Sequence, residues 1–437
     1  MAIIPQLIMF GWNEIENLGD LERLRLALEY MPDEELMQTL EKERGKGRDD
    51  FPVRAMWNSI IAGVVFQHSS IESLRRELSR NGQLRFMCGF RSDKVPEAYV
   101  YTRFFSNLFN KEKIINELFD ALVNELEELL PSLGTSLAID GKAISSLAKK
   151  ENKNKAEDGR RDLDANLGIK EYKGVRRDGA AWTKIVKWFG YRLHLIVDAD
   201  YELPVAFEIT KASTSEVKQA HKMIEKLDES HPELIRKCET FIADRGYDDT
   251  RLYEKLWDGY TIKPVIDIRN MWKGKDKTRQ LQDYENVTYD YKGNVYCTCM
   301  ETGKERDMCV GGFERNRKRY GTLRKLCPAK QYGTECKYSD KCTVKRGIRI
   351  DIELDRRIFT PIDRVSYKWG RTYAKRPSVE RVNSRLDESF GFEKHYIRGI
   401  KKMKTKCGIA LCVMLAMAVG RIKEGQADKM RSLVKSA

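Results

Sequence analysis

The chain lacks the features that mark a secreted or membrane-embedded protein. Its first stretch, 1–9, is apolar, but it has neither the basic start nor the small-residue cleavage site of a secretory leader. The longest apolar run, 407–420, falls short of the roughly 20 residues that cross a bilayer. Lysine and arginine flank this run on both sides, which is typical of a buried helix with solvated ends. The sequence therefore predicts no membrane span, and we expect a cytoplasmic protein.

Two cysteine patterns are also missing. Six of the ten cysteines fall between residues 297 and 342, whereas a secreted disulfide framework spreads its cysteines over a shorter chain. Paired Cys-x-x-Cys knuckles, the strong signal of structural zinc, do not occur in this cluster. The cluster is either a zinc-binding insertion or a small insertion packed by reduced cysteines. The candidate zinc ligands are Cys297, Cys299, Cys327, Cys336 and Cys342.

An excess of acidic residues is absent as well. The 437 residues include 80 Lys and Arg against 66 Asp and Glu, which gives a formal charge of +14. This balance favours a nucleic-acid partner over an acidic small molecule. The alternative is a basic cytosolic protein without such a partner. The hydrophobic share of 41% is ordinary for a soluble globular protein and leaves room for two or three domains.

The pattern of apolar residues divides the chain into four parts, and no internal repeat is present. Residues 1–130 read as helices, and 131–268 alternate strands with helices, which predicts a mixed α/β sheet. Residues 269–357 form the Cys-rich insertion, and 358–437 return to helix. The expected strands are 136–140, 191–198, 203–210, 240–244 and 260–267, with helices at 215–227 and 250–257. The charge-dense stretch 149–161 is predicted to be a mobile surface loop.

The helical first part has two interpretations. Ser69-x-x-Glu72 is a capping-box signature that opens a helix with arginines on its outer face. Short helices with exposed Arg and Lys fit a helix-turn-helix DNA-binding unit. They fit a packing or dimerisation domain equally well.

Three separated carboxylates indicate metal chemistry. Asp140 and Asp244 each close an expected strand, where open α/β sheets place their ligand sites. Glu380 lies on a helix that Pro377 begins at its first position. Magnesium prefers oxygen ligands, and pairs of such ions cleave phosphodiesters. Singly, each acid is more often a turn or cap residue, so the joint pattern carries the prediction.

Basic and aromatic residues near the helix of Glu380 and elsewhere in the chain are candidates for contacts with DNA. Tyr373 and Arg376 precede the helix of Glu380, where a phosphate would meet both the helix dipole and Arg376. The segment 394–406 is basic and contains no acid, so we expect it to track a DNA backbone. Its candidate DNA contacts are Lys394, Arg398, Lys401 and Lys402. Trp182, Trp188, Trp257 and Trp369 are candidates for stacking on unpaired bases, although most tryptophans are core residues.

An ordered series of motifs resembles one known family. The series is Asp140-Gly141, Trp188-Phe189-Gly190-Tyr191-x-x-His194, Leu203-Pro204-Val205-Ala206, Ala243-Asp244-Arg245-Gly246-Tyr247-Asp248 and Tyr373-x-x-Arg376-x-x-x-Glu380. It resembles the DDE transposases of bacterial insertion sequences, in the group with the Tyr-Arg-Glu signature. The stretch from Phe51 to Phe109 is similar to the N-terminal helical domain of that group. The resemblance therefore covers most of the chain.

The resemblance implies an RNase H-like catalytic domain with Asp140, Asp244 and Glu380 as its catalytic, metal-binding triad. It implies two Mg²⁺ or Mn²⁺ ions as cofactors and DNA as partner. Such enzymes bind the terminal inverted repeats of their element, hydrolyse a strand at each end and direct the 3′-hydroxyl at target DNA. They bring two ends together, which implies a homodimer or a larger assembly.

One position departs from the family pattern. The signature usually continues with a lysine seven residues after the glutamate, and this chain has Asp387 there. Arg385 and Lys394 are candidates to replace that lysine. Two other functions keep most of these features. One is an RNase H-fold nuclease or resolvase without strand transfer, and the other is an inactive DNA-binding remnant.

Overall fold

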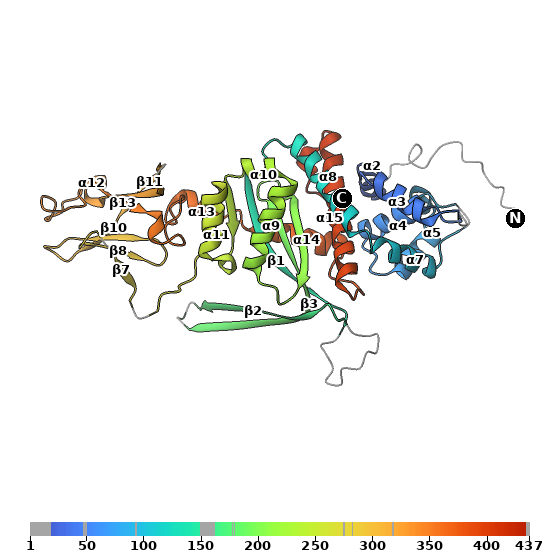
Figure 1. Ribbon diagram of the computed structural model, residues 1–437, viewed down its shortest axis with the longest axis horizontal. Coiled ribbons are helices and arrows are strands. Elements are labelled where there is room, and N and C mark those ends of the chain that lie inside the picture. The colour runs from blue at the N-terminus through green and yellow to red at the C-terminus, as the bar shows by residue number, and fades with distance from the viewer. Residues whose placement is uncertain are drawn as a thin grey trace.

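The computed structural model describes residues 19–46, 50–91, 94–148, 162–176, 178, 180–273, 276–281, 283–316 and 319–433. The loop predicted at 149–161 lies outside these residues. Figure 1 shows three parts along the long axis: helices of the first part at one end, the main sheet in the middle, and the Cys-rich insertion at the other end.

The first part is helical throughout its described residues, as predicted. Its helices are α2 (Leu21–Glu29), α3 (Glu34–Arg44), α4 (Val53–Val65), α5 (Ile71–Arg80), α6 (Gly82–Cys88), α7 (Ala98–Leu108) and α8 (Glu112–Leu129). The cap of α5 falls one residue later than predicted. The Ser73 amide donates to the Ser70 hydroxyl at 3.1 Å, so Ser70 rather than Ser69 caps the helix. Ser70 has the extended backbone that an N-cap residue adopts.

The long helix α15 (Ile400–Lys423) packs against the first part and the sheet. Its 24 residues are long and apolar enough to cross a membrane, so the expectation of a run too short to span one is wrong. The apolar window of the helix is nevertheless 83% buried, mainly against α8, α2 and β4, which confirms a buried core helix. Two glycines allow the close approach. A Cβ on Gly408 would lie 2.7 Å from Ile115 of α8, and one on Gly420 would lie 2.7 Å from Leu26 of α2.

The main sheet confirms the predicted mixed α/β, RNase H-like fold class. Its strands are β1 (Ser136–Ser145), β2 (Asn166–Val175), β3 (Ala181–Asp198), β4 (Pro204–Lys211), β5 (Thr240–Ala243) and β6 (Lys263–Ile266). The order is β2-β3-β1-β5-β6, with β4 also paired to β3. β1 runs antiparallel to β3 and parallel to β5, which is parallel to β6. The associated helices are α9 (Glu216–Ser230), α10 (Pro232–Lys237), α11 (Thr250–Glu254), the 3-10 turn η1 (Arg245–Tyr247) and the π-helical turn η2 (Lys255–Gly259).

Strand β3 is much longer than the strand expected at 191–198. Its inner half, from Tyr191 onward, pairs with β1 on one side and β4 on the other. Its outer half pairs only with β2, from Asn166 opposite Gly190 to Val175 opposite Ala181. The β2–β3 arm, defined here as residues 166–175 and 181–189, therefore leaves the sheet as a two-stranded ribbon (Figure 1).

The Cys-rich insertion has a core of its own. Its strands are β7 (Thr278–Gln280), β8 (Val287–Asp290), β9 (Val295–Thr298), β10 (Glu305–Asp307), β11 (Cys309–Asn316), β12 (Arg319–Leu326) and β13 (Ile348–Asp351). Its short helices are α12 (Pro328–Tyr332) and η3 (Ile352–Leu354). Two sheets, β10-β9-β8-β7 and β11-β12-β13, enclose buried side chains such as Val287, Leu323 and Phe359.

After the insertion the chain returns to the main sheet through α13 (Tyr367–Tyr373) and α14 (Pro377–Phe390); the short η4 (Ala427–Lys429) follows α15. Pro377 stands in the first turn of α14, as predicted. The predicted apolar stripe of this helix is buried, and the helix packs on β1 and β3. The stripe consists of Val379, Val382, Leu386 and Phe390. This packing turns the opposite side of α14, which carries Glu380, toward solvent.

Candidate active site

Asp140 and Asp244 leave neighbouring parallel strands at the same edge. The last residues paired between β1 and β5 are Ile139 and Ala243, and each is followed directly by one of the acids. Asp244 ends its strand as predicted. The prediction that Asp140 ends β1 is wrong, because β1 continues to Ser145 along β3. Asp140 lies instead where the parallel pairing stops. Since paired strands lie about 4.8 Å apart, the two acids are neighbours at this edge.

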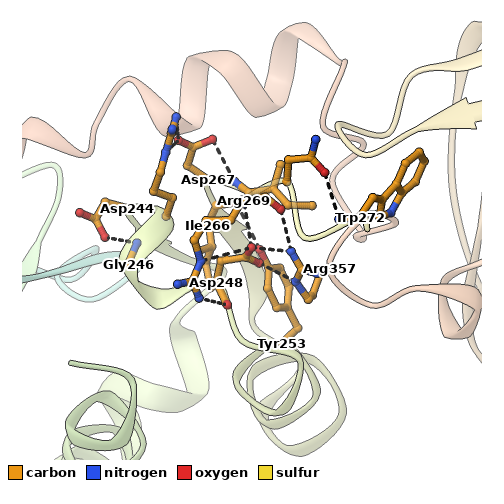
Figure 2. Close-up of polar contacts among 12 residues, drawn as sticks. Asp244, Gly246, Asp248, Tyr253, Ile266, Asp267, Arg269, Trp272 and Arg357 are labelled. Carbon is orange, nitrogen blue, oxygen red and sulfur yellow. Dashed lines mark hydrogen bonds and ion pairs between the residues drawn. The ribbon is translucent and has the colours of Figure 1, made fainter. Parts of the chain in front are cut away.

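A glycine amide holds each of these carboxylates. The Gly141 amide donates to Oδ1 of Asp140 at 2.7 Å. Figure 2 shows the second contact, in which the Gly246 amide donates to Oδ1 of Asp244 at 2.7 Å. A Cβ on Gly246 would lie 2.7 Å from the same Asp244 oxygen, so a larger residue here would displace this carboxylate. The glycines that follow the two acids in the sequence motifs therefore serve to hold the two carboxylates.

Glu216 is a further carboxylate at this edge, and no sequence pattern indicated it. It is the first residue of α9 and faces both glycines. A Cβ on Gly141 would lie 2.7 Å from its Oε1, and one on Gly246 would lie 3.1 Å from its Oε2. Arg192 Nη1 lies 2.9 Å from Oε1, but this buried oxygen accepts no hydrogen bond of good geometry. An acid in the first turn of a helix is common because it complements the helix dipole, so nothing in the sequence marked it.

Two cations stand beside Asp140. Lys170 Nζ lies 4.0 Å from Oδ1 and Arg376 Nη1 lies 4.0 Å from Oδ2. Lys170 also lies 3.7 Å from Glu216. Burial raises the pKa of Asp140 to about 6, Lys170 acts against this shift, and the negative charge of Asp244 adds to it. Asp140, Asp244 and Glu216 thus crowd together at one edge of the sheet, and Oε1 of Glu216 has no hydrogen-bond donor. This arrangement fits a site that binds a cation.

Glu380 is not assembled with the other two predicted acids. Its carboxylate forms an ion pair with Arg376 one turn earlier, and its side chain is 52% exposed. Arg376 therefore stands between Asp140 and Glu380. Within the described part of the chain, no three His, Cys, Asp or Glu side chains are close enough together to enclose a metal ion.

Tyr373 and Arg376 flank the start of α14, where they were expected. Arg376 is the residue before the first turn of the helix. Tyr373 ends α13, and its ring stacks on Trp369 with centroids 4.8 Å apart. Burial raises the pKa of Tyr373 to about 12, so the phenol keeps its proton and remains a hydrogen-bond donor.

The basic segment after α14 divides into outer and inner residues. Lys394, Lys401 and Lys402 are exposed, and Arg398 is half-buried. Lys404 instead pairs with Glu112 and Glu208 at 2.9 Å each. Burial lowers the pKa of Lys406 to about 8. Three of the four predicted DNA contacts in this segment are therefore exposed, whereas Arg398 is only partly exposed.

The resemblance predicts a lysine at position 387 of α14, and here Asp387 stands there and forms an ion pair. Asp387 contacts Lys142, which comes from β1 two residues after Asp140. Glu393 lies 3.1 Å from the same Lys142 ammonium. Arg385 donates to the backbone oxygen of Glu202 at 2.6 Å and is largely buried, so it does not replace the lysine at the site.

Asp248 fastens the Cys-rich insertion beside Asp244 (Figure 2). Its buried carboxylate accepts from Nη2 of Arg357 at 2.6 Å and from the Arg269 amide at 2.8 Å. These arginines are the first and last residues of the predicted insertion. Arg245 adds a pair with Asp267 at 2.7 Å. The motif after Asp244 thus holds both ends of the insertion at the site.

The cysteines of the insertion converge. One small cavity is lined by all five predicted zinc ligands: Cys297, Cys299, Cys327, Cys336 and Cys342. Cys309 does not line it and lies beside Tyr332. Burial raises the pKa of Cys297 to about 11, and the neighbouring thiols add to the shift. Several thiolates cannot be charged side by side without a cation. The five cysteines share one cavity, but among the described residues no three of them are close enough together to enclose a metal ion.

Comparison with known proteins gives two family matches. The family described as "Transposase DDE domain" matches residues 170–416, and the "Transposase domain (DUF772)" matches residues 13–107. No curated protein matches the chain. Among solved structures, the chain is similar to a piggyBac transposase in a synaptic complex with hairpin DNA. That similarity has 11% identity and a TM-score of 0.30 over 96% of this chain and 86% of the other.

Proposed function

The chain belongs to the Transposase DDE domain family, and on this premise we propose that it is the transposase of an insertion sequence. It cuts DNA at the terminal inverted repeats of its element and directs the freed 3′-hydroxyl at target DNA. The observation that supports this most is the placement of Asp140 and Asp244. They leave adjacent parallel strands at one edge, each held by a glycine amide.

Asp140, Asp244 and Glu380 are proposed to hold two Mg²⁺ or Mn²⁺ ions, with Glu216 as a fourth carboxylate. Such ions supply a Lewis acid that activates the attacking oxygen and stabilises the leaving one. Glu380 reaches the other acids only after its ion pair with Arg376 opens. Arg376 is then available to bind phosphate at the positive end of α14.

The DNA contacts proposed beside the acids are basic or aromatic residues around α14 and the start of α15. They are Tyr373, Arg376, Lys394, Arg398, Lys401 and Lys402. They position the DNA backbone and carry little sequence information. Reading of the terminal repeat is assigned to the helical first part. Because two ends must meet, the active form is a homodimer or a larger assembly.

The Cys-rich insertion is proposed to bind one structural zinc ion. Its ligands come from the five cysteines that line the cavity, and four thiolates complete a structural site. Zinc there would fix β9, α12 and the segment before β13 to one another, because Cys297, Cys327 and Cys342 come from these parts of the chain. The ends of this insertion meet at Asp248, so its order also bears on the active site.

The test is cleavage of labelled DNA that carries the ends of the chain's own element, with Mg²⁺ or Mn²⁺. Asp140→Asn, Asp244→Asn and Glu380→Gln should each lower nicking and strand joining about 100-fold or more while DNA binding persists. Glu388→Gln is the matched control, because Glu388 is an exposed acid on the same helix as Glu380. Its activity should equal that of the wild type.

The outcomes separate the candidate functions. Nicking without strand joining in the wild type would indicate a nuclease, and binding without nicking would indicate an inactive remnant. Cleavage that persists in one acid variant would remove that residue from the metal site.

A further inference from the structure

The β2–β3 arm is strongly basic and leaves the sheet beside the catalytic edge. The stretch 166–190 contains six Lys and Arg but only two acids. The outer half of β3 pairs with β2 alone, and most side chains from Ala181 to Lys187 are exposed. This outer half packs on no further strand of the sheet, and its excess of positive charge points to a polyanion.

The strand register separates two faces of the arm. Lys170 lies opposite Val186, and Gly174 lies opposite Trp182, so these pairs share one face with Lys184. Lys187 and Ile185 belong to the other face, since side chains alternate along a strand. The first face is called the inner face, because its Lys170 reaches Asp140 and Glu216.

Glycines and tryptophans shape the inner face. A Cβ on Gly174 would lie 2.6 Å from the Trp182 ring, and one on Gly168 would lie 2.4 Å from the Trp188 ring. Both rings therefore lie flat across the partner strand. Trp188 is buried near the sheet, whereas Trp182 is 38% exposed farther out. Trp182 thus has one ring face on the ribbon and the other open to solvent.

We propose that the inner face of the arm, with Lys184 and Trp182, is a track for the DNA that enters the active site; this proposal rests on the proposed function. Lys184 contacts a backbone phosphate, and Trp182 packs on a sugar or an unstacked base. Successive inner-face residues on β3 are about 6.8 Å apart, which is close to two base-pair steps. A two-stranded ribbon also has the width that a DNA major groove admits.

The arm offers a matched pair of lysines for the test. Lys184 and Lys187 are both exposed on β3, but they lie on opposite faces. Binding of the full chain to a duplex with its element end is measured by fluorescence anisotropy over a range of salt. Lys184→Ala should weaken binding roughly threefold to tenfold and reduce the salt dependence by about one ion. Lys187→Ala should change neither quantity.

A second measurement does not depend on affinity. A photo-crosslinking benzoylphenylalanine at position 182 should crosslink to the DNA, and the same group at position 185, on the other face, should not. Equal behaviour of Lys184→Ala and Lys187→Ala, or equal crosslinking from 182 and 185, overturns the proposal. If the wild type still nicks its element end, only the arm proposal fails. If the wild type binds no DNA, the proposed function fails with it.

Discussion

Lys142 on β1 and Asp387 on α14 form an ion pair, with 2.5 Å between Nζ and Oδ2. The two side chains are only 12% and 19% exposed. The pair joins the strand that carries Asp140 to the helix that carries Glu380, so it ties two parts of the proposed metal site to each other. In this chain the lysine at that contact comes from the strand and the acid from the helix.

Asp387→Lys should therefore damage the protein rather than restore a family feature. It would place two ammonium groups against each other at a largely buried contact and lower the free energy of unfolding by about 3 kcal/mol. The double variant Lys142→Asp with Asp387→Lys should recover most of this loss. Urea unfolding followed by circular dichroism measures both effects. A single variant as stable as the wild type would show that the pair has no structural role.

Glu216→Gln should weaken metal binding as well as cleavage. The substitution keeps the shape of the side chain but removes the buried charge that faces Lys170 and Arg192. We expect the affinity for Mn²⁺, measured by titration calorimetry, to fall about tenfold or more. Glu229→Gln is the control, because Glu229 is exposed at the far end of the same helix. Unchanged Mn²⁺ affinity in Glu216→Gln would exclude Glu216 from the metal site.

Asp140→Asn should stabilise the protein when divalent metal is removed with a chelator. The unfolded carboxyl ionises near pH 3.8, but burial raises the folded pKa to about 6. The folded state is therefore penalised as pH rises through this interval, and the penalty is complete above pH 6. At pH 7.5 the asparagine variant should be more stable by about 2–3 kcal/mol.

The advantage of Asp140→Asn should shrink as the pH falls from 6 toward 4, because the folded carboxyl then holds its proton. Urea unfolding at several pH values measures this trend. A difference that does not change with pH would contradict a raised pKa at Asp140.

Zinc removal should loosen the insertion. Purified protein should contain about one zinc per chain, and cobalt in its place should show the absorption of thiolate ligands. Cys327→Ser should lower the metal content, whereas Cys309→Ser, outside the cavity, should retain it. Chelation should also make the insertion more sensitive to protease. Equal zinc in both serine variants, or none in the wild type, would exclude the site.

The sequence was most informative for elements whose apolar side chains are buried in the core. The strand of Asp244, the helix begun by Pro377 and the buried helix near the C-terminus follow from apolar runs and from proline, so their positions could be predicted. The β2–β3 arm could not, because a ribbon with both faces near solvent has no alternation of apolar and polar residues. Asp140 was assigned to a strand end because the apolar run stops there, although the backbone pairing continues.

The residues of the candidate site also divide into those that the sequence indicated and those that only the fold brings together. Asp140 and Asp244 were predicted because each directly follows an apolar run and because Glu380 completes a joint pattern of three acids. Glu216 was not, since its role depends on two glycines from distant strands that face the first turn of α9. The convergence of five cysteines in one cavity depends in the same way on how two small sheets pack.

The position of α15 also sets the order in which the protein can be completed on the ribosome. The helices α2, α4 and α8 emerge first, yet they share their core with a helix that is translated after the entire main sheet and the insertion. Domains usually fold from the N-terminus as they emerge. Here the first helices must wait with part of their apolar surface uncovered until α15 arrives. A nascent chain that stops before α15 would therefore expose the apolar surface of α2, α4 and α8, which chaperones could bind.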